Sequence, residues 1–128
     1  MKKNILSCFL LCLGTTMYAQ TYQFQTVKDI TSTPVISQDN TGTCWSFSTT
    51  SFLEAEIIRT TGKQIDLSEM YNVRNTYPKK AWNYIMRQGK AQFGEGALAH
   101  DVIHSARDFG IVPENVYEGN KLEGKYNH

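Results

Sequence analysis

The sequence is poor in cysteine and proline, and it has almost no net charge. It contains three cysteines and three prolines in 128 residues, and its formal net charge is +1. This balance of basic and acidic residues gives no electrostatic reason to expect binding to nucleic acid or to an anionic membrane. No apolar run reaches the roughly 20 residues that a membrane-spanning helix needs. The charge balance and the short apolar runs therefore disfavour a nucleic-acid-binding protein and a membrane-spanning protein, and the motifs are the more informative features.

Residues 1–19 have the pattern of a secretory signal. Two lysines near the start precede an apolar run over 5–13, and the small residue Ala19 follows at the expected cleavage point. The alternative of a membrane anchor would need a longer apolar run. A lipid anchor is disfavoured because neither Cys8 nor Cys12 follows the small-residue run. We expect cleavage after Ala19, export to the periplasm or the extracellular space, and no membrane attachment after the signal is removed.

Removal of that segment would leave Cys44 as the one cysteine of the mature chain. An internal disulfide would then be impossible. Exported proteins usually carry paired cysteines or none, so a lone thiol indicates a reactive group or an intermolecular partner. The alternative is a buried cysteine that packs as a small apolar residue. The neighbours of Cys44 decide between these two hypotheses.

The first expected helix spans about 44–60. Glycine and proline are absent from Cys44 until Gly62, which is a suitable residue just beyond a helix end. Its first half, residues 46–51, is unusually small and polar. That composition favours close packing against other backbone rather than a wide apolar face.

Two further helices are expected. Ser68 can cap the second, whose apolar stripe runs to Ile85 and is interrupted by Pro78. The proline predicts either a kink or a separate helix that begins there. The third helix has its stripe over 98–109 and ends at Gly110. The fold class predicted is mainly α, with an extended arm and loop over 20–43, one helical domain over 44–128, and no periodic pattern or closing element in the tail after residue 116.

The residues before Cys44 suit a nucleophile. A thiol attacks as the thiolate, and unpaired N–H groups and the dipole at a helix start favour that negative charge. Gly42 lets the chain turn sharply and leaves the sulfur open to a substrate. Gln38 lies six residues upstream, where its amide can reach an oxyanion beside the Cys44 N–H. The alternative for Gln38 is a loop amide that bonds its own backbone. These groups together indicate acyl transfer.

The segment 38–48, with a glutamine six residues before a Cys-Trp pair, resembles the active-site segment of papain-like cysteine peptidases. The resemblance continues, in the same order, through 67–69, 71–77, 93–97 and 109–114. It implies the helical left-hand domain of the papain-like α+β fold, with the β-barrel domain missing, and a peptide or protein as substrate. The implied catalytic residues are Cys44 and Gln38, and the implied substrate-binding residues are Gly42, Trp45, Gly94, Glu95, Gly96 and Ala97. No metal and no cofactor are implied.

Within that family the chain looks more like the bacterial branch of bleomycin hydrolase and aminopeptidase C. Papain has a cysteine three residues before the nucleophile, where this chain has Thr41, and residues 20–43 leave no room for an inhibitory prosegment. Relatives usually have two adjacent glycines in the cleft loop, whereas Gly96 is followed here by Ala97. We expect that methyl group to narrow the substrate pocket or to tilt the backbone that pairs with substrate.

The family's catalytic histidine and asparagine lie about 130 or more residues beyond the cysteine, farther than His128. We therefore expect both to be absent from this chain, together with the β domain that carries them, and we expect the chain alone not to hydrolyse peptides. His100 and His104 have a spacing that can bind a metal, but no third ligand is apparent, which favours solvated side chains. The alternative function is an exported, non-catalytic protein-binding module.

Overall fold

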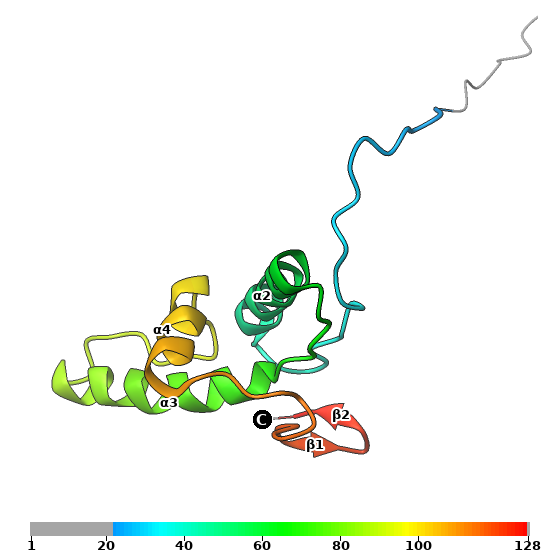
Figure 1. Ribbon diagram of the computed structural model, residues 1–128. Helices are drawn as coiled ribbons and strands as arrows, with labels where there is room; N and C mark the ends of the chain where they lie inside the picture. Colours follow the sequence, from blue (N-terminus) through cyan, green and yellow to red (C-terminus); the bar gives the residue numbers. More distant parts are fainter. Residues whose placement is uncertain (1–21, 128) are drawn as a thin grey trace, which may run out of the picture.

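The computed structural model describes residues 22–127. The predicted signal segment and its cleavage point lie outside the described residues. An extended arm over 22–43 leads into three helices, followed by a short hairpin (Figure 1). The elements are α2 (Cys44–Thr61), α3 (Glu69–Met86), α4 (Ala99–Phe109), β1 (Lys121–Leu122) and β2 (Lys125–Tyr126). The prediction of a mainly helical fold is confirmed, and the arm has no regular structure, as expected.

Helix α2 begins at Cys44 and ends where the sequence predicted. Gly62 adopts the left-handed conformation with φ 71°, and its N–H donates to the Ile58 carbonyl oxygen. A residue without Cβ takes this conformation without the steric cost that other residues meet. The small polar first half of α2 lies against α3, since the Ser46 hydroxyl donates to the Glu69 carbonyl oxygen at 2.8 Å. The prediction of close packing against backbone is confirmed.

Helix α3 is capped by Ser68, whose hydroxyl oxygen accepts from the Tyr71 N–H at 3.1 Å. It continues through Pro78 to Met86, so the prediction of a separate helix from Pro78 is wrong. A proline inside a helix removes one backbone donor, yet α3 continues for eight residues beyond Pro78 and contacts α4. Lys79 pairs with Asp108 of α4 at 2.5 Å. The second half of α3 is therefore held by α4.

Helix α4 contacts both other helices, and its buried residues are Val102 and Ser105. Gly110, with φ 81°, ends α4 as predicted. The predicted apolar stripe is only partly buried, because Leu98 and Phe109 at its two ends are exposed. The stripe therefore correctly predicts the helix but overstates the extent of its buried face.

The tail contains a hairpin that the sequence analysis did not predict. Strand β1 pairs antiparallel with β2, and Glu123 and Gly124 between them both have positive φ, at 51° and 78°. Two consecutive residues with positive φ are the requirement of the tight turn that matches strand twist. Tyr126 folds back onto α2, where its ring meets the Phe47 ring edge to face at 5.3 Å. The expectation of a tail without a closing element is wrong because this long-range contact supplies one.

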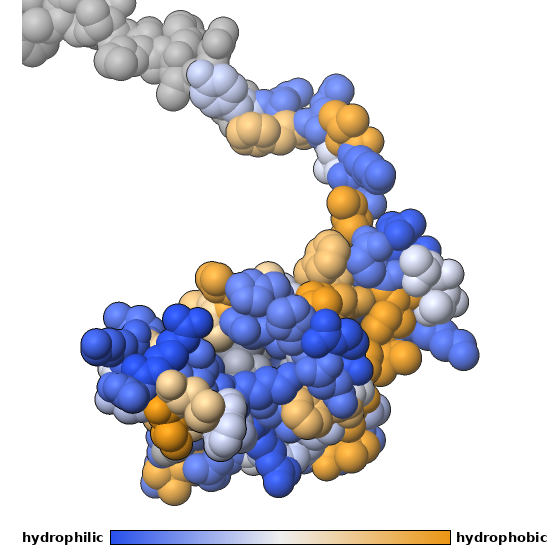
Figure 2. All heavy atoms as spheres, turned by 90° about the vertical axis from the view of Figure 1, so that its left-hand side faces the viewer, coloured by the Kyte–Doolittle hydropathy of each residue, from blue (hydrophilic) through white to orange (hydrophobic). Residues whose placement is uncertain are grey.

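The hydrophobic core is small. It is formed by buried side chains from all three helices and the hairpin, namely Trp45, Phe47, Met70, Val73, Val102 and Tyr126. Many apolar side chains stay exposed, and Figure 2 shows them gathered where the arm joins the helical part. Val35 in the arm is 100% exposed and Phe52 on α2 is 60% exposed. Among residues 22–127, no helix has the length and apolar character needed to cross a bilayer.

Candidate active site

Cys44 is the first residue of α2, and its side chain is exposed with a free thiol. The N–H groups of Ser46 and Phe47 donate to the Thr43 carbonyl oxygen at 2.8 and 3.2 Å, which closes the first turn. No side chain caps this helix start. The sulfur therefore lies where backbone N–H groups and the helix dipole favour negative charge. The alternative of a buried, structural cysteine is wrong.

The loop before Cys44 is tied to itself by side chains. The Gln38 amide donates to the Thr41 carbonyl oxygen at 2.6 Å, and the Thr41 hydroxyl donates to the Gln38 carbonyl oxygen at 2.7 Å. The Thr41 and Thr43 hydroxyls are 2.5 Å apart. This is the geometry of the alternative in which Gln38 bonds its own loop. A glutamine amide carries two N–H donors, so the bond to Thr41 is compatible with a second donor for an oxyanion, and that role of Gln38 stays a prediction.

Asp39 links this loop to the end of the chain. Its backbone is left-handed, with φ 52°, and its carboxylate accepts from the Tyr126 N–H at 2.9 Å. Sequence analysis missed both residues. No local pattern joins them, because they are separated by 87 positions.

The predicted cleft loop, residues 94–97, lies beside the start of α2. The Trp45 indole N–H donates to the Glu95 carbonyl oxygen at 3.1 Å, and the Tyr77 hydroxyl donates to the same oxygen at 3.4 Å. The Lys80 ammonium donates to the carbonyl oxygens of Gly94 and Gly96. Trp45 itself is buried in the core. The structure thus brings this loop, Trp45 and Cys44 together, and α3 holds the loop through two residues that sequence analysis did not select.

Glu95 and Gly42 are in direct contact. A Cβ placed on Gly42 would lie 2.2 Å from Glu95 Oε2 and 2.6 Å from Glu95 Cβ. Glycine at position 42 is therefore required by the approach of Glu95, in addition to the turn that the sequence indicated. Ala97 is half-buried and packs against the core cluster. Its methyl group therefore contacts the core, and the expectation that it narrows the substrate pocket or tilts the backbone that pairs with substrate stays a prediction.

An open hollow of about 410 Å³ adjoins this loop. It is lined by Tyr77, Phe93, Gly94 and Glu95. Burial, and after it the nearby Glu95 carboxylate, raises the pKa of the Tyr77 hydroxyl. The hollow therefore combines two aromatic side chains with one acidic side chain.

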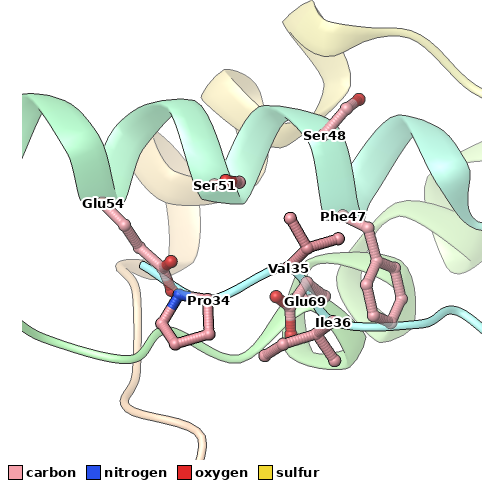
Figure 3. A pocket seen from close by; sticks show the side chains of 8 residues that line it. All are labelled: Pro34, Val35, Ile36, Phe47, Ser48, Ser51, Glu54 and Glu69. Atoms are coloured by element: carbon pink, nitrogen blue, oxygen red, sulfur yellow. The ribbon is translucent and has the colours of Figure 1, made fainter. Parts of the chain in front are cut away.

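A second hollow, of about 200 Å³, lies between the arm and α2 (Figure 3). It is lined by Pro34, Val35 and Ile36 of the arm, by Phe47, Ser48, Ser51 and Glu54 of α2, and by Glu69 from the start of α3. Both carboxyl groups are almost fully buried. Burial raises the pKa of Glu69 to about 7, neighbouring carboxylates add to the rise, and a backbone hydrogen bond opposes it. Glu54 instead accepts from the Thr33 hydroxyl and the Leu67 N–H.

The two histidines of α4 do not approach the cysteine. Among the described residues, the His100 and His104 rings contact each other at 5.6 Å, and no hydrogen bond joins either ring to Cys44. His100 also lies 3.6 Å from Asp101. No group of three or more histidine, cysteine or acidic side chains in residues 22–127 is placed to hold a metal ion. The described residues thus supply a thiol, a helix start and a cleft loop, but no histidine that is hydrogen-bonded to the thiol.

Comparison with known proteins identifies the family of this chain. The family model described as "Papain family cysteine protease" matches residues 19–97. The chain is 45% identical to human cathepsin L2 over 85 residues and 37% identical to cysteine proteinase 2 of Zea mays over 67 residues. Those matches cover 66% and 44% of this chain, but only 23% and 19% of the relatives. The chain therefore spans about a fifth of the length of these two relatives.

Proposed function

We propose that this chain, which belongs to the papain family of cysteine proteases, is the helical part of an exported peptidase in which Cys44 is the nucleophile. The exposed sulfur at the first residue of α2, beside the loop 94–97, is the observation that carries the proposal. The Cys44 thiolate attacks the carbonyl carbon of a peptide bond and forms a C–S bond. The C–N bond then breaks, a proton passes to the leaving amine, and water hydrolyses the thioester.

Gln38 and the Cys44 N–H are proposed to stabilise the oxyanion that forms during this attack. In the structure the Gln38 amide is anchored to the Thr41 carbonyl oxygen within one turn of Cys44. The glutamine amide carries two N–H donors, so the second one is available for this role. Trp45 is proposed to shield the thiolate, and residues 94–97 with Gly42 are proposed to contact the substrate backbone.

The base is proposed to be a histidine, oriented by an asparagine, from a β domain of the same polypeptide outside these 128 residues. The absence of a histidine bonded to Cys44 among the described residues supports this division. So do the exposed side chains of Val35 and Phe52, which offer an apolar surface beside α2 for another domain. On this proposal the 128-residue chain by itself does not hydrolyse peptides.

Export and the family branch are part of the same proposal. The pattern of residues 1–19 supports a signal peptide and a periplasmic or extracellular location. The motifs at 93–97 and 109–114, and Thr41 in place of a cysteine, support a branch like bleomycin hydrolase and aminopeptidase C. Trimming of peptides from the amino end is the activity which that branch implies.

Alkylation of Cys44 tests the proposal. Iodoacetamide is added to the 128-residue chain near neutral pH, and mass spectrometry follows the peptide that contains Cys44. An activated thiol reacts several times faster in the folded chain than in the chain unfolded by urea, because the helix start favours the thiolate. Folded Cys44 reacting no faster than unfolded Cys44 would refute the proposed nucleophile.

The alternative function is an exported binding module without catalysis. Continuing the reading frame past His128 separates the two hypotheses. An extension with a histidine and an asparagine that pair in the folded product supports the peptidase, and cleavage of a casein substrate must then be lost in Cys44→Ser. A stop codon directly after His128 favours the binding module.

A further inference from the structure

Glu95 is the one acidic residue of the cleft loop 94–97. Its carboxylate lies against Gly42, which precedes Cys44 by two residues. Because consecutive Cα atoms are 3.8 Å apart, this contact keeps the Glu95 carboxylate within about 11 Å of the Cys44 Cα. A negative charge is thus placed on the loop that leads into Cys44, by a residue that is distant in sequence.

The backbone that carries Glu95 is held from two helices. Its carbonyl oxygen accepts from Trp45 of α2 at 3.1 Å and from Tyr77 of α3 at 3.4 Å. Lys80 binds the carbonyl oxygens on both sides of it. Because its backbone is fixed, the Glu95 carboxylate stays close to one position. A charge at a fixed position can distinguish one substrate from another.

The hollow on this loop suits a cation. Tyr77 and Phe93 line it together with Glu95, and aromatic faces attract positive groups. Tyr77 already has an ammonium near its ring, since Lys80 Nζ lies 5.8 Å from the ring centroid. Lys80 offsets part of the field of Glu95, but it donates to loop carbonyl groups and leaves the Glu95 side chain exposed.

We propose that Glu95 makes the cleft selective for peptides that carry a positive charge beside the bond under attack. The charge is either a free amino terminus or a lysine or arginine side chain, and both share the chemistry of a cation paired with a carboxylate. This inference rests on the proposed function, because it takes Cys44 as the nucleophile. It adds a substrate class and the residue that recognises it.

Charged thiol reagents test the field at Cys44 in the 128-residue chain. Two methanethiosulfonates are compared, one carrying a trimethylammonium group and one carrying a sulfonate. The thiolate attacks the sulfenyl sulfur, a disulfide forms and methanesulfinate leaves. Mass spectrometry of the Cys44 peptide gives the two rates and leaves Cys8 and Cys12 out of the measurement.

Glu95→Gln is expected to lower the ratio of cation rate to anion rate by about two- to fourfold at low ionic strength. The effect should shrink in high salt, since screening shortens the reach of an exposed charge. Glu95→Asp keeps the charge and should keep most of the ratio. Glu56→Gln is the matched control, because Glu56 is an acidic residue of α2 about 18 Å along the helix axis from Cys44.

Peptide chloromethyl ketones then distinguish the two sources of charge. Cys44 displaces chloride and forms a thioether with dialanine probes whose amino end is free or acetylated, and with an acetyl-lysyl-alanine probe. An advantage of the free-amino probe that disappears in Glu95→Gln assigns Glu95 to the substrate's amino terminus. An advantage of the lysyl probe that disappears assigns it to a basic side chain. Equal rates for all three probes overturn the inference.

The two proposals fail in different ways. If folded Cys44 reacts no faster than unfolded Cys44 with every reagent, the proposed nucleophile is wrong. If Cys44 is activated but its rate ratio is unchanged in Glu95→Gln, the nucleophile stands and the charge selection is refuted. Circular dichroism of each variant verifies that the helices are retained.

Discussion

Replacing Glu69 by glutamine should change how the stability of the chain depends on pH. Glu69 is 3% exposed, and its Oε2 atom has no hydrogen-bond partner among the described residues. Burial raises the pKa of its carboxyl group from 4.5 to about 7. The folded state therefore holds the proton more tightly than the unfolded state. This contribution to stability is complete below about pH 4.5 and is lost as the pH rises through about 7.

The loss amounts to at most about 3 kcal/mol, since one pKa unit corresponds to about 1.4 kcal/mol and water in the adjoining hollow reduces the effect. Urea unfolding followed by circular dichroism measures the free energy of unfolding of both proteins from about pH 5 to about pH 8. The free energy of unfolding of Glu69→Gln should increase relative to that of the original chain as the pH rises, because the glutamine amide has no proton to lose. A stability difference that stays constant across this range would show that Glu69 does not titrate as stated.

Two further substitutions probe the fold. Ser68→Ala removes the α3 cap and the bond to the Tyr117 carbonyl oxygen, so urea unfolding should show a loss of about 2 kcal/mol; an unchanged midpoint would contradict the role of the cap. Gly119→Ala should destabilise by about 2 to 4 kcal/mol, because φ is +74° and the new Cβ would lie 2.5 Å from Met70 Cβ. Gly124→Ala is its control, with φ +78° and open space around the new Cβ, and it should cost only about 1 to 2 kcal/mol when urea unfolding measures both variants. Equal losses would exclude a close packing of Gly119 on Met70.

The helices could be predicted because their determinants are local. Ser68 and Gly62 act within one turn of the helix ends that they specify. The effect of Pro78 on α3 was harder to predict. The loss of one backbone donor has to be compared with contacts to α4, which is distant in sequence. The hairpin was missed for a similar reason. Its turn signal is one glycine after a glutamate, and its stability comes from Tyr126 packing on Phe47.

The candidate site divides in the same way. Cys44 at a helix start and the loop containing Gly42 are local features that the sequence shows directly. Other contacts of the site join segments that are distant in sequence, and no periodic pattern predicts them. They are the contact of Glu95 with Gly42 and the bonds from Tyr77 and Lys80 to the loop. Ala97 shows the limit most clearly. Sequence comparison indicated where its methyl group departs from relatives, but only the structure indicates that this group faces the core.

The small core explains why so much of the site is held by polar bonds. Few apolar side chains are buried, so the loops around Cys44 gain little from hydrophobic packing alone. Each loop is instead fixed by a distant donor, with the Tyr126 N–H on Asp39 and the Trp45 indole on Glu95. Such bonds depend on direction as well as distance. The tail and the cleft loop therefore contribute to the geometry at Cys44 although neither is adjacent to it in the sequence, and a change in either should alter the reactivity of the thiol before it unfolds α2.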